Sequence, residues 1–170
     1  MSPLSRVLLV GLLFTTMGVV RPARAEQEVP KELQGIAIDG TLGAKVPLDL
    51  SFVDQSGKQV QLRDYFVGGR PVILALAYYS CPMLCTLVLN GLVEGMRPLP
   101  FSPGKEYQVV TLSIDPRDQP HLALAKRAVY LQSLKRELGD VGRDWPFLSG
   151  SEQDIAKVAA AVGFHFRWDK

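Results

Sequence analysis

The sequence predicts an α/β fold in which a sheet containing parallel strands is flanked by helices. Two short alternating runs joined by a turn indicate a hairpin near the start of the folded part. The uninterrupted apolar run 72–79 and the mainly apolar run 107–114 suit buried strands, and each is followed by a segment with helical periodicity. The resulting order of hairpin, strand, helix, strand, helix, strand and helix is typical of helices packed on a partly parallel sheet.

The first residues predict export. Ser5-Arg6 precedes an apolar stretch from Val7 to Val20, and Ala23-Arg24-Ala25 places small residues at a cleavage site. The stretch is shorter than the roughly 18 to 20 residues that cross a bilayer. We therefore expect residues 1–25 to be a signal peptide and the protein to reach the periplasm or the outer face of the cytoplasmic membrane. A retained anchor, with membrane proximity, is the alternative.

The charge pattern gives no support to nucleic-acid binding. The chain carries 19 basic and 17 acidic residues, and loss of residues 1–25 removes three arginines and no acid. The remaining 16 basic and 17 acidic residues form no basic stripe. The charge therefore points to no class of partner.

Residues 26–46 are polar and show no sustained period, which predicts a linker, so the folded domain is expected over 47–170. The hairpin is expected to join Leu48–Val53 to Val60–Leu62 through a turn at Asp54–Gly57.

The run 72–79 lacks alternation, so we expect a central strand covered on both faces that leads directly to Cys81. A helix should follow and end before Pro98. Its expected apolar face consists of Leu84, Val88, Leu92 and Met96, with Leu87 and Gly91 alongside.

The second buried strand, 107–114, should stop at Asp115-Pro116, and Pro120 should begin the next helix. The apolar stripe expected on that helix is Leu124, Ala128, Leu131, Leu134 and Leu138, with Lys126, Arg127, Lys135, Arg136 and Glu137 on its other faces.

A short strand is expected at Trp145–Leu148, then a helix capped by Ser151 and ended by Gly163. Residues 165–168 could begin another strand with nothing after it to cover it, so we expect a truncated version of a longer domain.

Cys81 and Cys85 are the residues best suited to chemistry. Side chains four apart lie on one face of a helix, so both thiols could reach one ion. A helix N-terminus favours the thiolate, which is a soft ligand for Cu(I) or zinc and also a nucleophile. A structural disulfide is the plainer alternative, although a bridge across so short a loop removes little chain entropy.

The motif Cys81-Pro82-Met83-Leu84-Cys85 after an apolar strand, with Ser113-Ile114-Asp115-Pro116-Arg117-Asp118 further on, resembles the Sco/SenC family. The resemblance runs from about Pro47 to Trp168. It implies a thioredoxin-like fold, here lacking the last strands and helix. It also implies an exported or membrane-tethered protein that binds copper, Cu(I) or Cu(II), and helps assemble the dinuclear copper centre of cytochrome c oxidase.

The same resemblance implies three metal ligands, of which two map onto Cys81 and Cys85. The third is a histidine that lies beyond the helix ending at Gly163, and it is not found in this chain. His165 is too close to that helix, and His121 begins an earlier one, so neither is expected to be a ligand.

Three functional hypotheses stay open. The first is a copper-binding assembly factor whose partner is the copper-binding subunit of cytochrome c oxidase or another exported copper protein. The second is a thiol–disulfide oxidoreductase in which Cys81 attacks and Cys85 resolves. The third is a truncated domain without activity.

Two further residues have a possible role beside the thiols. Asp115 either tunes them or forms a strand-terminating Asp-Pro turn, and the turn is favoured. Met83 either offers a thioether to Cu(I) or packs at the helix start, and packing is favoured.

Overall fold

The computed structural model of the protein describes residues 30–31, 34–80, 84–135 and 144–167, and for Leu84 and Cys85 it describes the backbone. The chain divides into two compact units, residues 1–34 and 35–170. Most of the first unit lies outside the described residues, so the expected signal peptide does too. The helices and strands of the fold belong to the second unit, residues 35–170.

A three-stranded parallel sheet forms the centre of this unit. Its order is β4 (Val72–Ala77), β5 (Gln108–Ser113) and β6 (Phe147–Leu148). All six residues of β5 are buried, whereas β4 has buried and partly exposed positions and pairs, within the described ranges, with β5 alone. Among the described residues β4 is therefore an edge strand and not the expected central one, although its side chains belong to the cores on both faces of the sheet, as expected. Hydrophobicity alone could not order the two strands, because β5 is fully buried although it contains Gln108, Thr111 and Ser113.

The expected hairpin is present as β2 (Ser51–Val53) and β3 (Gln59–Gln61), which pair antiparallel. The Asp54 side chain builds the turn, since its Oδ1 accepts hydrogen bonds from the amides of Ser56 and Lys58 at 2.8 and 3.0 Å. Val53 exchanges two backbone hydrogen bonds of 2.8 Å with Ser149, directly after β6. The hairpin thereby continues the sheet beyond β6.

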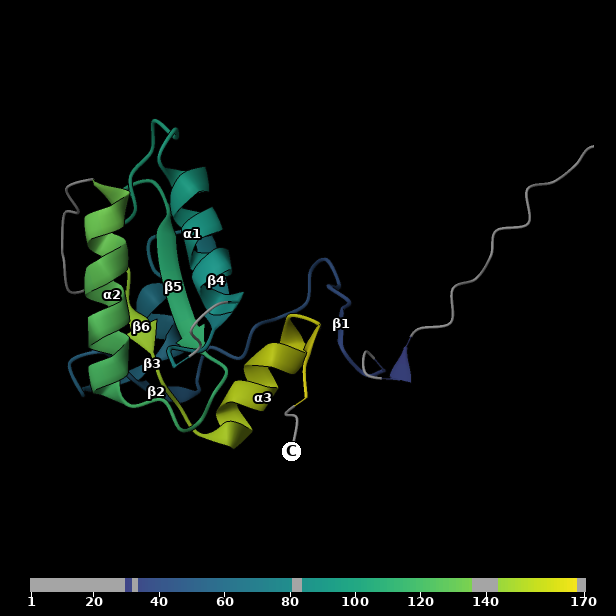
Figure 1. The fold of residues 1–170 in the computed structure, drawn as a ribbon. Coiled ribbons are helices and arrows are strands. Elements are labelled where there is room, and N and C mark those ends of the chain that lie inside the picture. The colour runs from purple at the N-terminus through teal and green to yellow at the C-terminus, as the bar shows by residue number, and fades with distance from the viewer. Residues whose placement is uncertain (1–29, 32–33, 81–83, 136–143, 168–170) are drawn as a thin grey trace, which may run out of the picture. The chain divides into compact units, whose positions relative to one another are not determined.

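Helices α1 (Leu84–Met96) and α2 (Pro120–Leu134) lie side by side over one face of the sheet (Figure 1). Buried side chains from both helices, β4, β5 and β6 meet there. This core consists of Ala75, Ala77, Tyr79, Leu89, Val93, Met96, Tyr107, Val109, Ala123, Tyr130, Leu134, Trp145 and Phe147.

A second core covers the opposite face. It is built from the hairpin, the short 3-10 helix η2 (Leu62–Tyr65) and helix α3 (Glu152–Ala161). Its buried residues are Phe52, Leu62, Tyr65, Val110, Leu112, Leu148, Ile155 and Val158. Neighbouring residues of β5 alternate between the two cores, as side chains on a strand must. Ser151 caps α3 and Gly163 follows it with φ +68°, as expected.

The apolar stripe expected on α2 is partly wrong. Leu134 is buried and Leu131 packs against the core, as expected, and Leu138 lies outside the described residues. The buried positions are Ala123, Arg127, Tyr130 and Leu134, whereas Leu124 is 53% exposed. Arg127 was expected on an outer face, but its Nε donates to the carbonyl oxygen of Trp145 at 2.8 Å. A long side chain with apolar methylenes can lie in a core when its head finds a partner.

The apolar face expected on α1 is also partly wrong. Leu89, Val93 and Met96 are buried, while Leu87 and Val88 are 63% and 53% exposed. The polar residues of α1 are Thr86, Asn90 and Glu94, which leave a broad apolar arc on the rest of the helix. The sheet contacts one side of that arc rather than its centre.

The segment expected to be an irregular linker contains a strand. β1 (Ala37–Ile38) pairs antiparallel with β7 (Phe164–His165), which follows α3. The strand expected from His165 onward is thus present in part, and β1 covers one edge of it. Within the ranges that the structure describes, no helix has the length and apolar character to span a membrane.

Candidate thiol site and its polar support

The sequence motif lies where β4 passes into α1. β4 ends at Ala77 and α1 begins at Leu84, so the backbone of Cys85 is in the first turn of this helix. Backbone N–H groups without helical partners and the positive end of the helix dipole gather in a first turn, and both favour a thiolate. Cys81 and Met83 lie outside the described residues.

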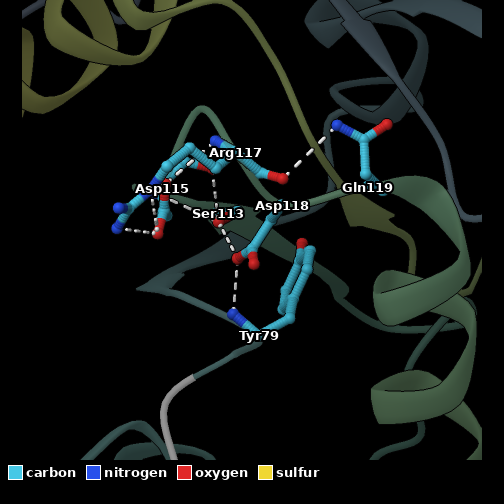
Figure 2. A network of polar contacts seen from close by, with 6 residues as sticks. All are labelled: Tyr79, Ser113, Asp115, Arg117, Asp118 and Gln119. Atoms are coloured by element: carbon cyan, nitrogen blue, oxygen red, sulfur yellow. Dashed lines mark hydrogen bonds and ion pairs between the residues drawn. The ribbon is translucent and has the colours of Figure 1, made fainter.

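Tyr79 is anchored at both ends just before the motif. Its backbone N–H donates to Oδ2 of Asp118 at 2.6 Å (Figure 2). Its hydroxyl donates to the carbonyl oxygen of Leu148 at 2.7 Å. The ring lies 5.7 Å from that of Phe147, centroid to centroid. The residue two positions before Cys81 is therefore fixed to the strand-end loop after β5 and to β6.

Asp118 and Ser113 form the buried centre of the hydrogen-bond network that holds Tyr79. The Ser113 hydroxyl donates to the same Oδ2 of Asp118 at 2.6 Å, and the amide of Asp115 donates to the Ser113 oxygen at 3.1 Å. Asp118 is 3% exposed and Ser113 is fully buried. A buried carboxylate needs such donors to offset the loss of its hydration.

The sequence places Ser113 and Asp118 in the second motif, but the motif alone assigned neither residue a role. The signal that could have found them is a serine at the end of a buried strand with an aspartate just past an Asp-Pro turn. Short polar side chains in that arrangement commonly bind backbone groups nearby.

Asp115 forms the turn that its sequence context favours. The amide of Asp118 donates to the carbonyl oxygen of Asp115 at 3.1 Å. The Asp115 carboxylate is paired with the Arg117 guanidinium, at 2.9 Å from Nε and 2.8 Å from the terminal nitrogen. Hydrogen bonding to Arg117 lowers the pKa of the Asp115 carboxyl, against a smaller opposing effect of burial.

Burial raises the pKa of the Tyr79 phenol well above its usual value, and the negative charge of Asp118 adds to the effect. The hydroxyl therefore stays protonated and remains a donor to Leu148.

Neither histidine takes part in the hydrogen bonds that hold Tyr79 and Asp118. His121 is exposed in the first turn of α2. His165 is exposed in β7, with its Nε2 at 3.9 Å from a carboxylate oxygen of Asp39. In the part of the chain that the structure describes, no three His, Cys, Asp or Glu side chains are grouped so that they could hold a metal ion.

Comparison with solved structures gives the same fold. Two crystal structures of Aquifex aeolicus VF5 proteins match, one described as a candidate electron transfer protein and one as a candidate electron transport protein. The first is 28% identical, with a TM-score of 0.64 over 76% of this chain and 70% of that one. The second is 29% identical, with a TM-score of 0.61 over 75% of each chain.

A third structure, Arabidopsis thaliana ScoI with copper bound, is 22% identical with a TM-score of 0.50, and the alignment covers 66% of this chain and 63% of that one. A search of curated proteins gave no match. The profile of the SCO1/SenC family matches residues 39–170, which is most of the chain. With the α/β architecture of a thioredoxin-like Sco protein and this match, the chain belongs to the SCO1/SenC family.

Proposed function

We propose that the protein is an exported copper-binding assembly factor that holds the metal through the thiolates of Cys81 and Cys85. The copper is its cargo, delivered to a copper-binding subunit of cytochrome c oxidase or to another exported copper protein. Membership of the SCO1/SenC family supports this proposal, and Arabidopsis thaliana ScoI is a protein solved with copper bound.

The observation that carries the proposal is the placement of the motif between β4 and α1. Cys85 lies in the first turn of α1, where the helix favours a thiolate, and thiolates are soft ligands that suit Cu(I). The residue two before Cys81 is fixed by Asp118 and Leu148, which limits where the motif can begin. Fixing the backbone at Tyr79 lowers the conformational entropy that metal binding beyond it has to remove.

The test is an anaerobic titration of the reduced protein with Cu(I) against a competing chelator. We expect one copper per chain, and we expect Cys81→Ser and Cys85→Ser each to weaken binding by more than the roughly 10- to 100-fold typical of losing an outer partner of a metal ligand. Ser80→Ala, His121→Ala and His165→Ala are the controls and should leave the affinity unchanged. Copper binding that survives both cysteine substitutions would refute the proposal.

A second candidate function is thiol–disulfide exchange, which is itself a transfer of electrons, and the two Aquifex aeolicus proteins are described as candidates for electron transfer and electron transport. The Cys81 thiolate would attack a partner disulfide and form a mixed disulfide. Cys85 would then displace the partner's sulfur, so that the partner's disulfide gains two electrons and the Cys81–Cys85 pair loses them. Turnover of a model disulfide that disappears in Cys81→Ser would support this candidate, and no turnover would reject it.

A further inference from the structure

A pocket of about 380 Å³ lies beyond the ends of strands β5 and β6. Its walls come from the hairpin, the loop between β5 and α2, and the segment that joins β6 to the first turn of α3. The chain leaves β5 for α2 on one face of the sheet and leaves β6 for α3 on the opposite face. In open α/β sheets, ligands bind outside the carboxyl ends of strands at such a divergence.

The pocket contains an aspartate that is buried without a cation. Asp118 and Asp154 both line the pocket, and none of the described residues that line it is a lysine or an arginine. Asp118 is 3% exposed, and its Oδ2 accepts from two neutral donors, whereas its Oδ1 accepts from no described residue. It forms no ion pair with a described residue, although buried charges are ordinarily paired.

Ser149 is a second, independent indication of a ligand. It is 5% exposed, and its Oγ has no hydrogen-bond partner among the described residues. Side chains alternate along an extended chain, so Ser149 points to the same face of the sheet as Phe147. This is the face on which α2 begins and on which Asp118 lies. A buried hydroxyl without a partner is costly, so a donor brought into the pocket would stabilise it.

We propose that this pocket receives an arginine side chain of a partner protein. A guanidinium group presents N–H donors in a planar fork and is weakly hydrated, which suits the free oxygen of Asp118 beside the Ser149 hydroxyl. Phe52, Pro116 and Pro120 supply apolar surface for the methylenes of the arginine.

The position of the pocket favours a protein as the source of the arginine. Strands β4, β5 and β6 are parallel, so the pocket lies at the same edge of the sheet as the start of the thiol motif. A protein that approaches Cys81 and Cys85 must cover part of this edge. The choice of partner therefore rests on the proposed function, whereas the arginine site itself does not.

A bound anion is the main alternative, because α2 and α3 both begin at the pocket and helix N-termini attract anions. The chain already places acids at both helix starts. Glu152 and Asp154 lie in the first turn of α3, and Asp118 directly precedes the N-cap of α2. Pro120, the first residue of α2, has no N–H to offer an anion. A cation is therefore favoured.

The test is a titration of the reduced, copper-free full chain with N-acetyl-arginine amide, followed by backbone amide signals in NMR. We expect saturable shifts at Gln119, Ser149 and Gly150. N-acetyl-citrulline amide, which has nearly the same shape but no charge, and inorganic phosphate should give none. Absence of binding by the arginine amide, equal binding by the citrulline amide, or phosphate binding at these residues would overturn the proposal. Free L-arginine that binds when the blocked amide does not would also overturn it, because the pocket would then take a small molecule.

Substitutions locate the binding charge. Asp118→Asn keeps an oxygen that can accept from Tyr79 and Ser113 but removes the charge, and it should weaken binding of the arginine amide by at least about tenfold. Asp154→Asn alters a less buried residue of the same pocket and should also weaken binding, which keeps the test decisive if Asp118→Asn does not fold. Asp49→Asn removes an exposed carboxylate outside the pocket and should leave the affinity unchanged. Equal affinities in all three variants would refute the site.

Cys81→Ser separates this proposal from copper binding. The substitution removes a thiol and leaves Asp118, Ser149 and Asp154 in place, so binding of the arginine amide should be unchanged. Loss of copper binding with arginine binding retained would reject the proposed function and support the site. Copper binding without arginine binding would overturn the site and leave the proposed function intact.

Discussion

At the residue scale, the hydrogen-bond network next to the thiol motif depends on Asp118. One oxygen of its carboxylate, Oδ2, accepts hydrogen bonds from both the Tyr79 amide and the Ser113 hydroxyl. Both donors are buried, so neither can turn to water when the acceptor is lost. Leaving a buried donor without a partner costs about 1–3 kcal/mol. The position of the motif and the stability of the fold are therefore linked through one carboxylate.

We expect Asp118→Ala to lower the free energy of unfolding by about 2–5 kcal/mol, since two buried donors lose their acceptor. Denaturant unfolding measures this change. Asp49→Ala is the control, because Asp49 is exposed, and it should change stability by less than about 0.5 kcal/mol. Equal effects of the two substitutions would show that the Asp118 contacts contribute nothing.

The Asp115–Arg117 pair predicts a sensitivity to acid. The folded protein lowers the pKa of Asp115, so the stabilisation is present above the unfolded pKa of about 3.9 and is lost as pH falls through the folded pKa. Asp115→Asn should remove that part of the acid destabilisation. Comparing the unfolding free energies of the two proteins between pH 7 and pH 2 measures it, and parallel curves would contradict the assignment.

The Tyr79 phenol predicts a loss of stability at high pH. Its pKa is raised in the folded protein, so its stabilisation is complete below the unfolded pKa of about 10 and is lost as pH rises through the folded value. Tyr79→Phe should flatten the loss of stability in alkali while lowering stability at pH 7 by about 0.5–1.5 kcal/mol through the lost bond to Leu148. If the unfolding free energy of Tyr79→Phe fell at high pH as steeply as that of the unchanged protein, this role of the phenol would be rejected.

At the scale of elements, the helices show what the sequence could and could not predict. The hairpin, both long strands, the start of α2 at Pro120 and the Ser151 cap were predicted correctly because turn residues, proline and capping residues act locally. The buried faces of α1 and α2 were not predicted correctly, because the sequence of each helix allows more than one apolar face. In α2 the choice is made by tertiary partners: Arg127 binds the carbonyl of Trp145, and Tyr130 lies 6.4 Å from Phe147, centroid to centroid.

The orientation of α2 predicts unequal effects of two leucines. Leu134 is 1% exposed, so Leu134→Ala should cost about 2–5 kcal/mol of unfolding free energy. Leu124 is 53% exposed, so Leu124→Ala should cost less than about 0.5 kcal/mol. Both leucines belong to the stripe expected from sequence, and similar losses at both positions would restore that expectation.

The candidate site was only partly accessible to sequence reasoning. Cys85 could be placed in the first turn of a helix because a buried strand and an apolar helix flank the motif. The roles of Tyr79 and Asp118 could not be predicted from the sequence. The two residues are 39 positions apart and come together only when β4 and β5 pair.

At the scale of the whole molecule, the two cores on opposite faces of the sheet hold the strand ends and the start of α1 in one arrangement. The SCO1/SenC family assignment rests on that architecture and on the match over residues 39–170. Copper binding by the motif is the proposal on which the assigned function depends.

Copper K-edge X-ray absorption of the reduced, Cu(I)-loaded protein tests this proposal most directly, because it identifies the atoms bound to the metal. We predict two sulfur ligands per copper, falling to one in Cys81→Ser and in Cys85→Ser. A metal surrounded only by nitrogen and oxygen, or a spectrum unchanged by both substitutions, would contradict copper binding by the thiol pair.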